Sequence, residues 1–387
     1  MGNENNTVIN KIKLTRKQVG NLFIFVGILI ITTLEWHFFD WYQATTKYGT
    51  LITFAALAGA FFCYVDIKDA VRDKMFWIMA VTDVIALINL FIVGSNKGCF
   101  LIVVDFMLIL YLADKVEFDR KESIVMLGYT AFFFFYWTID VKGYFKGYNT
   151  NYGGLILITG FAFLMVLLHT VNFLKRKWCI PIYLFFIALA YNIISWYRSR
   201  TALMGLIVLL IIMIIPGKII TNKIIYPAIC ALASFGSIAL SGLYIVFGKF
   251  GDGEVQLFYK SVVSGRNDIW SELWDAYLQK PVTGIGSSYE MKLDFMKGMF
   301  EAHSAMMDIL VVHGVIVFAL VCGVLLYRLI KLKSQTASGF TGKVIFAAFI
   351  CILVTGFFEN YYIVQPFSLM FLSLFAVKPE KKEITGE

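Results

Sequence analysis

Charged residues are scarce in this chain. They make up 16% of its 387 residues, whereas hydrophobic residues account for 59% and aromatic residues for 17%. A typical soluble domain carries about 25% charged residues. A soluble chain of this length could bury a large core, but it could not hide this much apolar surface. The composition therefore excludes an ordinary soluble protein and predicts a polytopic membrane protein.

The patterns that hold metals or disulfides are also missing. All six cysteines lie within apolar runs or at their ends, and none forms a CxxC pair. We interpret them as small residues that face the core or the lipid. The chain has only four histidines and no HExxH or similar pair. We therefore expect no metal site and no cofactor.

A cleavable signal peptide is not indicated either. The first 18 residues are polar and basic, and the apolar run after them lacks a small-residue cleavage site. This pattern predicts a first transmembrane helix that is retained. No internal repeat or low-complexity linker is visible.

What the sequence does contain is a succession of apolar segments. A spanning helix needs about 20 mostly apolar residues. The candidates are residues 19–39, 49–65, 75–93, 98–114, 123–141, 152–174, 178–196, 200–216, 224–247, 304–326, 343–358 and 363–377. The shortest of these are compatible with re-entrant or tilted helices. The expected fold is all-α, a polytopic membrane helical bundle with about 12 transmembrane helices.

Basic residues indicate the orientation of this bundle. Most of the 34 Lys and Arg residues fall in segments that share one side, including 1–18, 327–343 and 378–387. Because cytoplasmic loops carry an excess of Lys and Arg, both termini are predicted to be cytoplasmic. The same loops account for the net charge of +8, so we expect no nucleic-acid partner.

Three regions follow from this topology. Residues 1–247 hold the first nine spans, 248–303 form an extracytoplasmic loop, and 304–387 hold the last three spans and a cytoplasmic tail. A long structured loop in a compact helical protein is usually functional. We therefore expect the catalytic chemistry to involve the 248–303 loop.

An amphipathic helix is predicted inside this loop, over residues 266–278. Helical spacing gathers one apolar stripe, which consists of Ile269, Trp270, Leu273, Trp274, Tyr277 and Leu278. Such a helix would rest in the membrane interface or against the top of the bundle. Pro281 ends it, and Gly284 and Gly286 permit a tight turn.

Three arginines on the predicted outer side are candidate anion ligands. Arg266 starts the amphipathic helix, and it is either a solvated surface residue or a clamp for phosphate or sugar. Its rigid fork suits a diphosphate. Arg198 and Arg200 lie in a short outer loop, where they either snorkel or form an anion site. We favour the anion site, because outer arginines run against the positive-inside tendency.

The run FEAHSAMMDILVVHGV, residues 300–315, supplies a candidate base. His303 lies at the outer entry to the tenth span, flanked by Glu301 and Asp308. A lone histidine there is commonly a structural hydrogen-bonding residue. Near a set of arginines, a histidine of near-neutral pKa suits the acceptance of a proton from an attacking hydroxyl. His313 has the pattern of a buried, satisfied residue.

Two acidic residues inside spans keep another class of function open. Asp83 and Asp105 lie in the middle of the third and fourth apolar segments. Intramembrane carboxyls usually have partners, and a proton-coupled transporter would use them. However, no matched pair of Gly/Pro-interrupted spans is visible in two halves of the chain.

Three motifs resemble the C-terminal signature of the O-antigen polymerase and ligase superfamily. They are SGRNDIW, KPVTGIGSSY and EAHSAMMDILVVHG, in that order before a hydrophobic span. SRTALMG and YNTNYGGLILIT, upstream, are similar to earlier elements of that family. The resemblance covers about residues 145–375. Ser304 stands where the family usually has Asn after the His, and His313 stands where an acidic or aromatic residue often precedes the Gly.

The resemblance implies a metal-independent, inverting glycosyltransferase at the outer face of the bacterial cytoplasmic membrane. Its substrates would be oligosaccharides linked to undecaprenyl diphosphate. Arg200 and Arg266 would stabilise the leaving diphosphate, and His303 would act as the base or orient the acceptor hydroxyl. The residues expected to bind the diphosphate or the glycan are Arg198, Trp270, Trp274 and Tyr289.

Polymerisation and ligation share this chemistry. We favour polymerisation into O-antigen, capsule or exopolysaccharide, because no segment resembles a dedicated acceptor-binding domain. A chain-length regulator and a flippase would be partners. Ligation of a finished glycan to another acceptor is the first alternative. A transporter or lipid-linked glycan flippase, or a non-catalytic scaffold, would belong to a different class.

Overall fold

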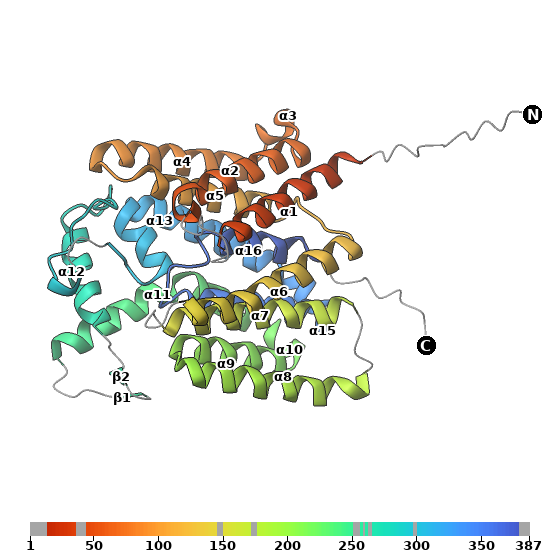
Figure 1. Ribbon diagram of the computed structural model, residues 1–387. Helices are drawn as coiled ribbons and strands as arrows, with labels where there is room; N and C mark the ends of the chain where they lie inside the picture. The colour runs from red at the N-terminus through yellow and green to blue at the C-terminus, as the bar shows by residue number, and fades with distance from the viewer. Residues whose placement is uncertain are drawn as a thin grey trace, which may run out of the picture.

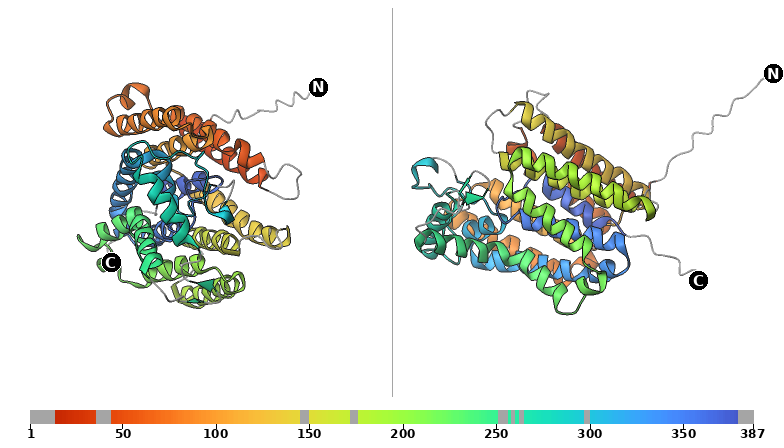
Figure 2. Two further views of the ribbon diagram at one scale, coloured as in Figure 1. Left: turned by 90° about the vertical axis from the view of Figure 1, so that its left-hand side faces the viewer. Right: turned by 90° about the horizontal axis from the view of Figure 1, so that it is seen from below.

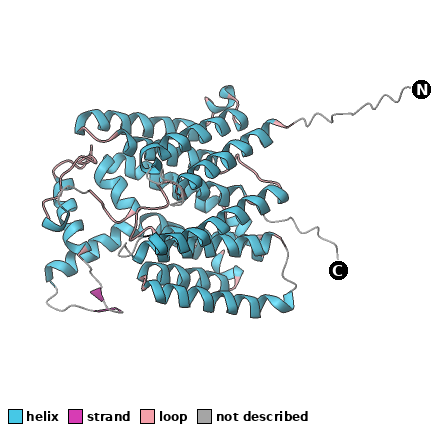
Figure 3. Cartoon of the chain, viewed as in Figure 1, coloured by secondary structure: helices cyan, strands magenta, loops and turns pink. Residues whose placement is uncertain are grey.

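The computed structural model describes residues 14–35, 44–144, 150–171, 176–250, 256–257, 260–261, 265–296 and 300–378. Regular structure in these residues is almost entirely helical (Figure 1, Figure 3). The strands among them are β1 (Gln256–Leu257) and β2 (Lys260–Ser261), which pair antiparallel. The expected all-α membrane fold is confirmed.

Each of the twelve expected apolar segments corresponds to one helix. These helices are α1 (Arg16–Leu34), α2 (Ala44–Tyr64), α4 (Lys74–Val93), α5 (Lys97–Leu112), α6 (Arg120–Tyr144), α7 (Thr150–Thr170), α8 (Arg176–Tyr197), α9 (Arg200–Ile214), α11 (Ile225–Phe250), α13 (Ala305–Lys331), α15 (Phe340–Thr355) and α16 (Phe367–Ala376). Within the described ranges, five are long and apolar enough to cross a membrane, namely α1, α4, α7, α11 and α13. The number of crossings therefore stays a prediction.

The remaining helices are short and lie in connections. They are α3 (Ile67–Ala70), α10 (Gly217–Ile220), α12 (Arg266–Leu278), α14 (Lys333–Ala337) and the 3₁₀ turn η1 (Asp294–Met296). Polar caps set several helix boundaries. Asp73 and Asn96 accept backbone N–H groups at the starts of α4 and α5, and Gly94 ends α4 with φ 68°.

The centre of the bundle is formed by α16 and the helices around it. All ten residues of α16 are buried, and α15 is buried from Gly342 to Thr355. Helices α1, α5 and α6 pack against α16 (Figure 1). In contrast, α4 exposes Ile88, Phe91 and Ile92, which is the apolar outer face expected of a helix in lipid.

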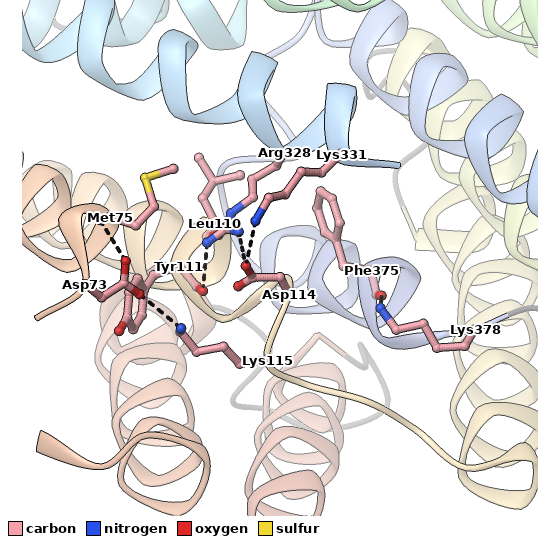
Figure 4. Close-up of polar contacts among 10 residues, drawn as sticks. All are labelled: Asp73, Met75, Leu110, Tyr111, Asp114, Lys115, Arg328, Lys331, Phe375 and Lys378. Carbon is pink, nitrogen blue, oxygen red and sulfur yellow. Dashed lines mark hydrogen bonds and ion pairs between the residues drawn. The ribbon is translucent and has the colours of Figure 1, made fainter. Parts of the chain in front are cut away.

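One end of the bundle carries a network of charges that ties α4, α5 and α13 together (Figure 4). Lys115 pairs with Asp73 at 3.1 Å, and Lys331 pairs with Asp114 at 3.3 Å. Arg328, which is buried, pairs with Asp114 at 2.5 Å and donates to the carbonyl oxygens near the end of α5. These residues lie in or next to segments that the basic-residue pattern places inside.

The opposite end carries α12 and the β1–β2 hairpin (Figure 1, Figure 2). There the turn after α4 binds the segment after α12. The Asn96 N–H donates to Ser287 Oγ at 2.9 Å, and Ser288 Oγ donates to the Gly94 carbonyl at 2.9 Å. Segments expected on opposite sides of the membrane therefore lie at opposite ends of the bundle.

Helix α13 is interrupted at Gly314, where φ is 83° and ψ is 171°. The segment after α12 fills the break. The Ile285 N–H donates to the Val311 carbonyl at 2.7 Å, and the Val315 N–H donates to the Pro281 carbonyl at 2.9 Å. The Pro/Gly-rich turn expected after α12 is thus confirmed, and it forms part of the hydrogen bonding of a membrane helix.

A second irregular stretch joins α15 to α16 over residues 356–366. It reaches the level of the middle of α5, where Gln365 Nε2 lies 3.4 Å from Asp105 Oδ2. Irregular backbone at this depth is tolerated when protein surrounds it, and Tyr361, Tyr362 and Ile363 are buried. This stretch carries Glu359 at the end of the bundle near α12.

Candidate functional site

Arg266 is the first residue of α12, and its guanidinium is buried. Its Nη2 donates to Glu359 Oε1 at 2.9 Å and to the Phe358 carbonyl at 3.2 Å. The Arg266 and Glu359 side chains are 9% and 7% exposed, respectively. The alternative of a solvated surface arginine is therefore excluded.

The expected apolar stripe positions Arg266 by packing α12 on the bundle. Ile269, Trp270, Leu273 and Tyr277 are buried, and α12 contacts α11 and α13. Of the two expected positions, the top of the bundle is the one observed. The Trp270 indole N–H also donates to the Ala302 carbonyl at 2.7 Å, which ties α12 to the segment that precedes α13.

This burial gives Trp270 a different role from the one expected of it. The side chain is 0% exposed, so neither indole face is open to a sugar. The hydrophobic effect buries this large aromatic side chain, so it anchors α12 on the bundle instead of binding a sugar.

His303 lies beside the same carboxylate. Its Nδ1 is 3.5 Å from Glu359 Oε2 and 3.3 Å from Glu301 Oε1. Glu359 therefore contacts Arg266 with one oxygen and His303 with the other. The backbone of His303 is left-handed, with φ 48°. A non-glycine residue in this region is strained, and such strain clusters at functional sites.

Arg200, the second expected leaving-group cation, belongs to another helix. It starts α9, where Ser199 caps the helix by accepting from the Ala202 N–H at 3.3 Å. The charges of both Arg200 and Arg266 act on the Tyr244 hydroxyl. The Tyr244 ring packs 5.1 Å from that of Trp270 and 6.0 Å from that of Phe358, and the Arg266 guanidinium lies 5.7 Å from the Phe358 ring, so Arg266 borders this aromatic cluster. The convergence of Arg200 with Arg266 stays a prediction.

The other expected binding residues lie further out. Arg198 is exposed, sits on the turn between α8 and α9, and has φ 50°. Trp274 and Tyr289 are half-buried. The Tyr289 hydroxyl donates to Glu272 Oε1 at 3.1 Å, which holds the segment after α12 against that helix. Contact of these three with a glycan or a diphosphate stays a prediction.

Glu301 is the more exposed carboxylate of the site, with 46% of its side chain accessible. Partial burial raises its pKa above the ordinary value. His303 acts in the opposite direction, because a positive imidazolium favours the charged carboxylate, and the negative charge of Glu359 adds to the increase.

The donor atoms of Glu301, His303 and Glu359 lie within 4.8 Å of one another, a spacing that a metal ion could bridge. Arg266 already neutralises Glu359, and a divalent cation beside the guanidinium would be repelled. The donor set therefore fits an ion-paired cluster better than a metal centre, and a metal-free site stays the prediction.

Sequence reasoning missed Glu359. The residue falls between two expected spans, 343–358 and 363–377. A signal was present, since FFENYY places one carboxylate among aromatic residues on the side where the three candidate arginines are expected. Hydropathy alone could not show that it meets Arg266, which lies 93 residues away.

Three residues outside the cluster were also singled out from the sequence. His313 is buried, as expected, and its carbonyl accepts from Asn89 Nδ2 at 2.8 Å. Asp83 and Asp105 each keep one carboxyl oxygen that is buried and has no hydrogen-bond partner in the described part of the chain. The structure does not bring these two carboxyls into the Arg266–Glu359–His303 cluster.

Comparison with known proteins gives one match. Residues 151–322 match a family model described as O-antigen ligase. No curated protein and no solved structure matches the chain. The matched region runs from α7 into α13 and contains Arg200, Arg266 and His303, whereas Glu359 lies beyond it.

Proposed function

We propose, from the O-antigen ligase family domain that this multi-pass membrane protein carries at residues 151–322, that the chain is a glycan-polymerising glycosyltransferase. It joins oligosaccharide repeat units carried on undecaprenyl diphosphate into a cell-surface polysaccharide. The reaction takes place at the outer face of the bacterial cytoplasmic membrane. In this orientation both termini are cytoplasmic and the 248–303 loop is outside.

The observation that carries the proposal is the convergence of Arg266, Glu359 and His303. The acceptor hydroxyl attacks the anomeric carbon of the donor, and the diphosphate leaves from the opposite face with inversion. Arg200 and Arg266 stabilise the negative charge that develops on the diphosphate. Arg266 Nε has no hydrogen-bond partner within the described residues, so it has a donor to offer.

His303 accepts the proton of the attacking hydroxyl. Its Nδ1 faces two carboxylates, which favours the tautomer with hydrogen on Nδ1 and leaves Nε2 as the basic nitrogen. Glu359 holds His303 and Arg266 in one arrangement, so the base and the leaving-group cation are positioned together. Trp274 and Tyr289 supply aromatic faces for the glycan.

A reconstituted elongation assay tests this proposal. Purified protein in liposomes is given a repeat unit linked to undecaprenyl diphosphate, with a chelator present. We expect the wild type to make longer glycans. Arg266→Lys and Arg200→Lys keep the positive charge but lose the planar guanidinium, which can donate two parallel hydrogen bonds. Each should reduce elongation by about 10²–10³-fold. Lys280→Gln, which removes an exposed cation at the end of α12, is the matched control.

Two results would contradict the enzyme proposal. One is wild-type protein that forms no glycosidic bond from a suitable lipid-linked substrate. The other is an Arg266→Lys variant as active as Lys280→Gln. Translocation of the lipid-linked glycan without bond formation would favour the transporter alternative.

Glycan products in cells separate polymerisation from ligation. Glycans of graded length that are lost on Arg266→Lys support a polymerase. Long glycans that accumulate without final attachment support a ligase. The polymerase remains our proposal, because the described residues of the 248–303 region belong to the end of α11, the short β1–β2 hairpin, α12, η1 and the segments that join them to the bundle.

One structural observation bears on the transporter alternative. The two interruptions described above, at Gly314 and over residues 356–366, both lie in the last quarter of the chain. Inverted-repeat transporters place interrupted helices in corresponding positions of two halves. This arrangement favours an enzyme with a site at one end of the bundle.

A further inference from the structure

We propose that Glu301 is a positioning residue whose carboxylate stabilises the imidazolium that forms when His303 takes a proton. The inference rests on the proposed function, because it assigns His303 the role of base. It concerns a side chain that the Arg266–Glu359 ion pair does not include.

Distance alone does not distinguish the two carboxylates beside His303. Glu301 Oε1 is 3.3 Å from Nδ1, and Glu359 Oε2 is 3.5 Å from the same atom. Charge does distinguish them. Glu359 contacts the Arg266 guanidinium at 2.9 Å, so its negative charge is already offset. The net negative charge that faces His303 is therefore that of Glu301.

Other charged groups of the neighbouring elements act less directly on His303. The charge of Glu301 acts on Asp308, which lies on the first turn of α13, and Arg266 acts on Glu301. Arg200, from α9, acts on Tyr244 of α11. Asp308 has no ion pair with His303 among the described residues. Glu301 and Glu359 are thus the carboxylates in contact with the imidazole.

The backbone between Glu301 and His303 is held in place. The carbonyl of Ala302 accepts from the Trp270 indole at 2.7 Å, and Ala302 is fully buried. The Ala305 N–H donates to the Gly356 carbonyl at 3.0 Å. With these anchors on both sides, the left-handed turn at His303 places the two side chains together before substrate binds.

Accessibility separates the roles of the two carboxylates. The Glu301 side chain is 46% exposed, whereas those of His303 and Glu359 are 18% and 7% exposed. Glu359, which is buried and ion-paired with Arg266, stabilises the local structure. A carboxylate in contact with water can be changed to an amide without loss of folding, which makes the proposal testable.

The first test measures His303 directly. The chain has four histidines, so the His303 ring signals are assigned in NMR spectra of detergent-solubilised protein by their loss in His303→Gln. In Glu301→Gln the imidazole pKa should fall by about 0.5–1 unit, because a neighbouring negative charge is removed but partial exposure weakens it. Glu290→Gln, an exposed carboxylate of the preceding segment, should leave it unchanged.

The second test is the pH profile of glycan elongation. His303 must be unprotonated to act, so the acidic limb of kcat/KM should move to lower pH in Glu301→Gln by the same shift. At the plateau kcat should fall, because the base is weaker, while KM changes little. A structural role alone would leave the acidic limb where it is.

The outcomes separate this inference from the proposed function. An unshifted His303 pKa in Glu301→Gln overturns the inference even if elongation is confirmed. Elongation that needs added Mg²⁺ or Mn²⁺, and a Glu301→Gln variant that no longer binds the ion, would also overturn it. If the wild type makes no product, the proposed function fails, and the NMR titration still decides whether Glu301 sets the titration of His303.

Discussion

Glu359 is the residue on which both Arg266 and His303 depend. Its carboxylate lies in a buried position, contacts the guanidinium with one oxygen and faces the imidazole with the other. Removing one partner of a buried ion pair is costly because the remaining charge has lost its solvent and its counter-ion. A loss of activity in Arg266→Ala alone would therefore mix a chemical effect with a folding effect.

A pair of substitutions separates these effects. Arg266→Ala should destabilise the protein by about 3–5 kcal/mol, because it leaves the buried Glu359 carboxylate without its counter-ion. Arg266→Ala combined with Glu359→Gln should recover most of that loss, since no buried charge remains. Thermal unfolding in detergent, followed by tryptophan fluorescence, measures both. Strictly additive losses would show that the two side chains are not coupled.

The sequence indicated the basic residues of the site, but it did not indicate the carboxylate of Glu359. Arg200, Arg266 and His303 occur in polar stretches beside apolar segments, where a functional interpretation has a physical basis. Glu359 was missed because its importance comes from a contact between distant segments. Sugar binding by Trp270 was expected from its residue type, but the side chain is buried by packing between α12 and the bundle. The helical spacing of an apolar stripe does not show which of its side chains will be fully buried.

At the scale of elements, α12 could be predicted and the break in α13 could not. The apolar stripe of residues 266–278 has helical spacing, and the helix occupies that range. The run around Gly314 is apolar on both sides, and a single glycine is tolerated inside a helix. Only the approach of the segment after α12 shows why this glycine leaves the helical conformation.

Gly314 should therefore be far less replaceable than another glycine of the same helix. A Cβ at Gly314 would lie 2.0 Å from the Val282 carbonyl oxygen, and the backbone there has φ 83°. Gly314→Ala should destabilise the protein by at least about 1–3 kcal/mol. At Gly323 a Cβ would meet nothing within 4 Å, so Gly323→Ala should leave the thermal midpoint unchanged or higher. Equal midpoints for the two variants would contradict the assigned contact.

The whole molecule has two polar ends separated by an apolar belt. One end gathers the Asp73, Asp114 and Arg328 contacts, and the other gathers Arg266, Glu359 and His303. The alternation of basic and non-basic loops predicted this partition of the loops between two ends, because the long apolar helices run from one end to the other. Helix α16, with ten residues, is too short to cross a membrane alone, in keeping with the re-entrant or tilted helices considered for the shortest apolar segments.

Labelling in intact cells tests the orientation. Glu290→Cys places a thiol near the α12 end, and Ser338→Cys places one between α14 and α15; both positions are exposed. A membrane-impermeant maleimide should label the first in intact cells and the second only after permeabilisation. The unsubstituted chain reports background from its native cysteines. The reverse pattern would place the candidate site in the cytosol and contradict the proposed reaction.

The hydrogen bonds across the break in α13 have a consequence for chimaeric proteins. The segment after α12 supplies the donor to Val311 and the acceptor for Val315, so it completes a helix that belongs to a different part of the chain. Grafting a relative's outer loop onto this bundle would leave those backbone groups without partners. The smallest transferable unit therefore extends from Gly265 through Val315, and swaps that stop at the start of α13 should yield protein that fails to accumulate.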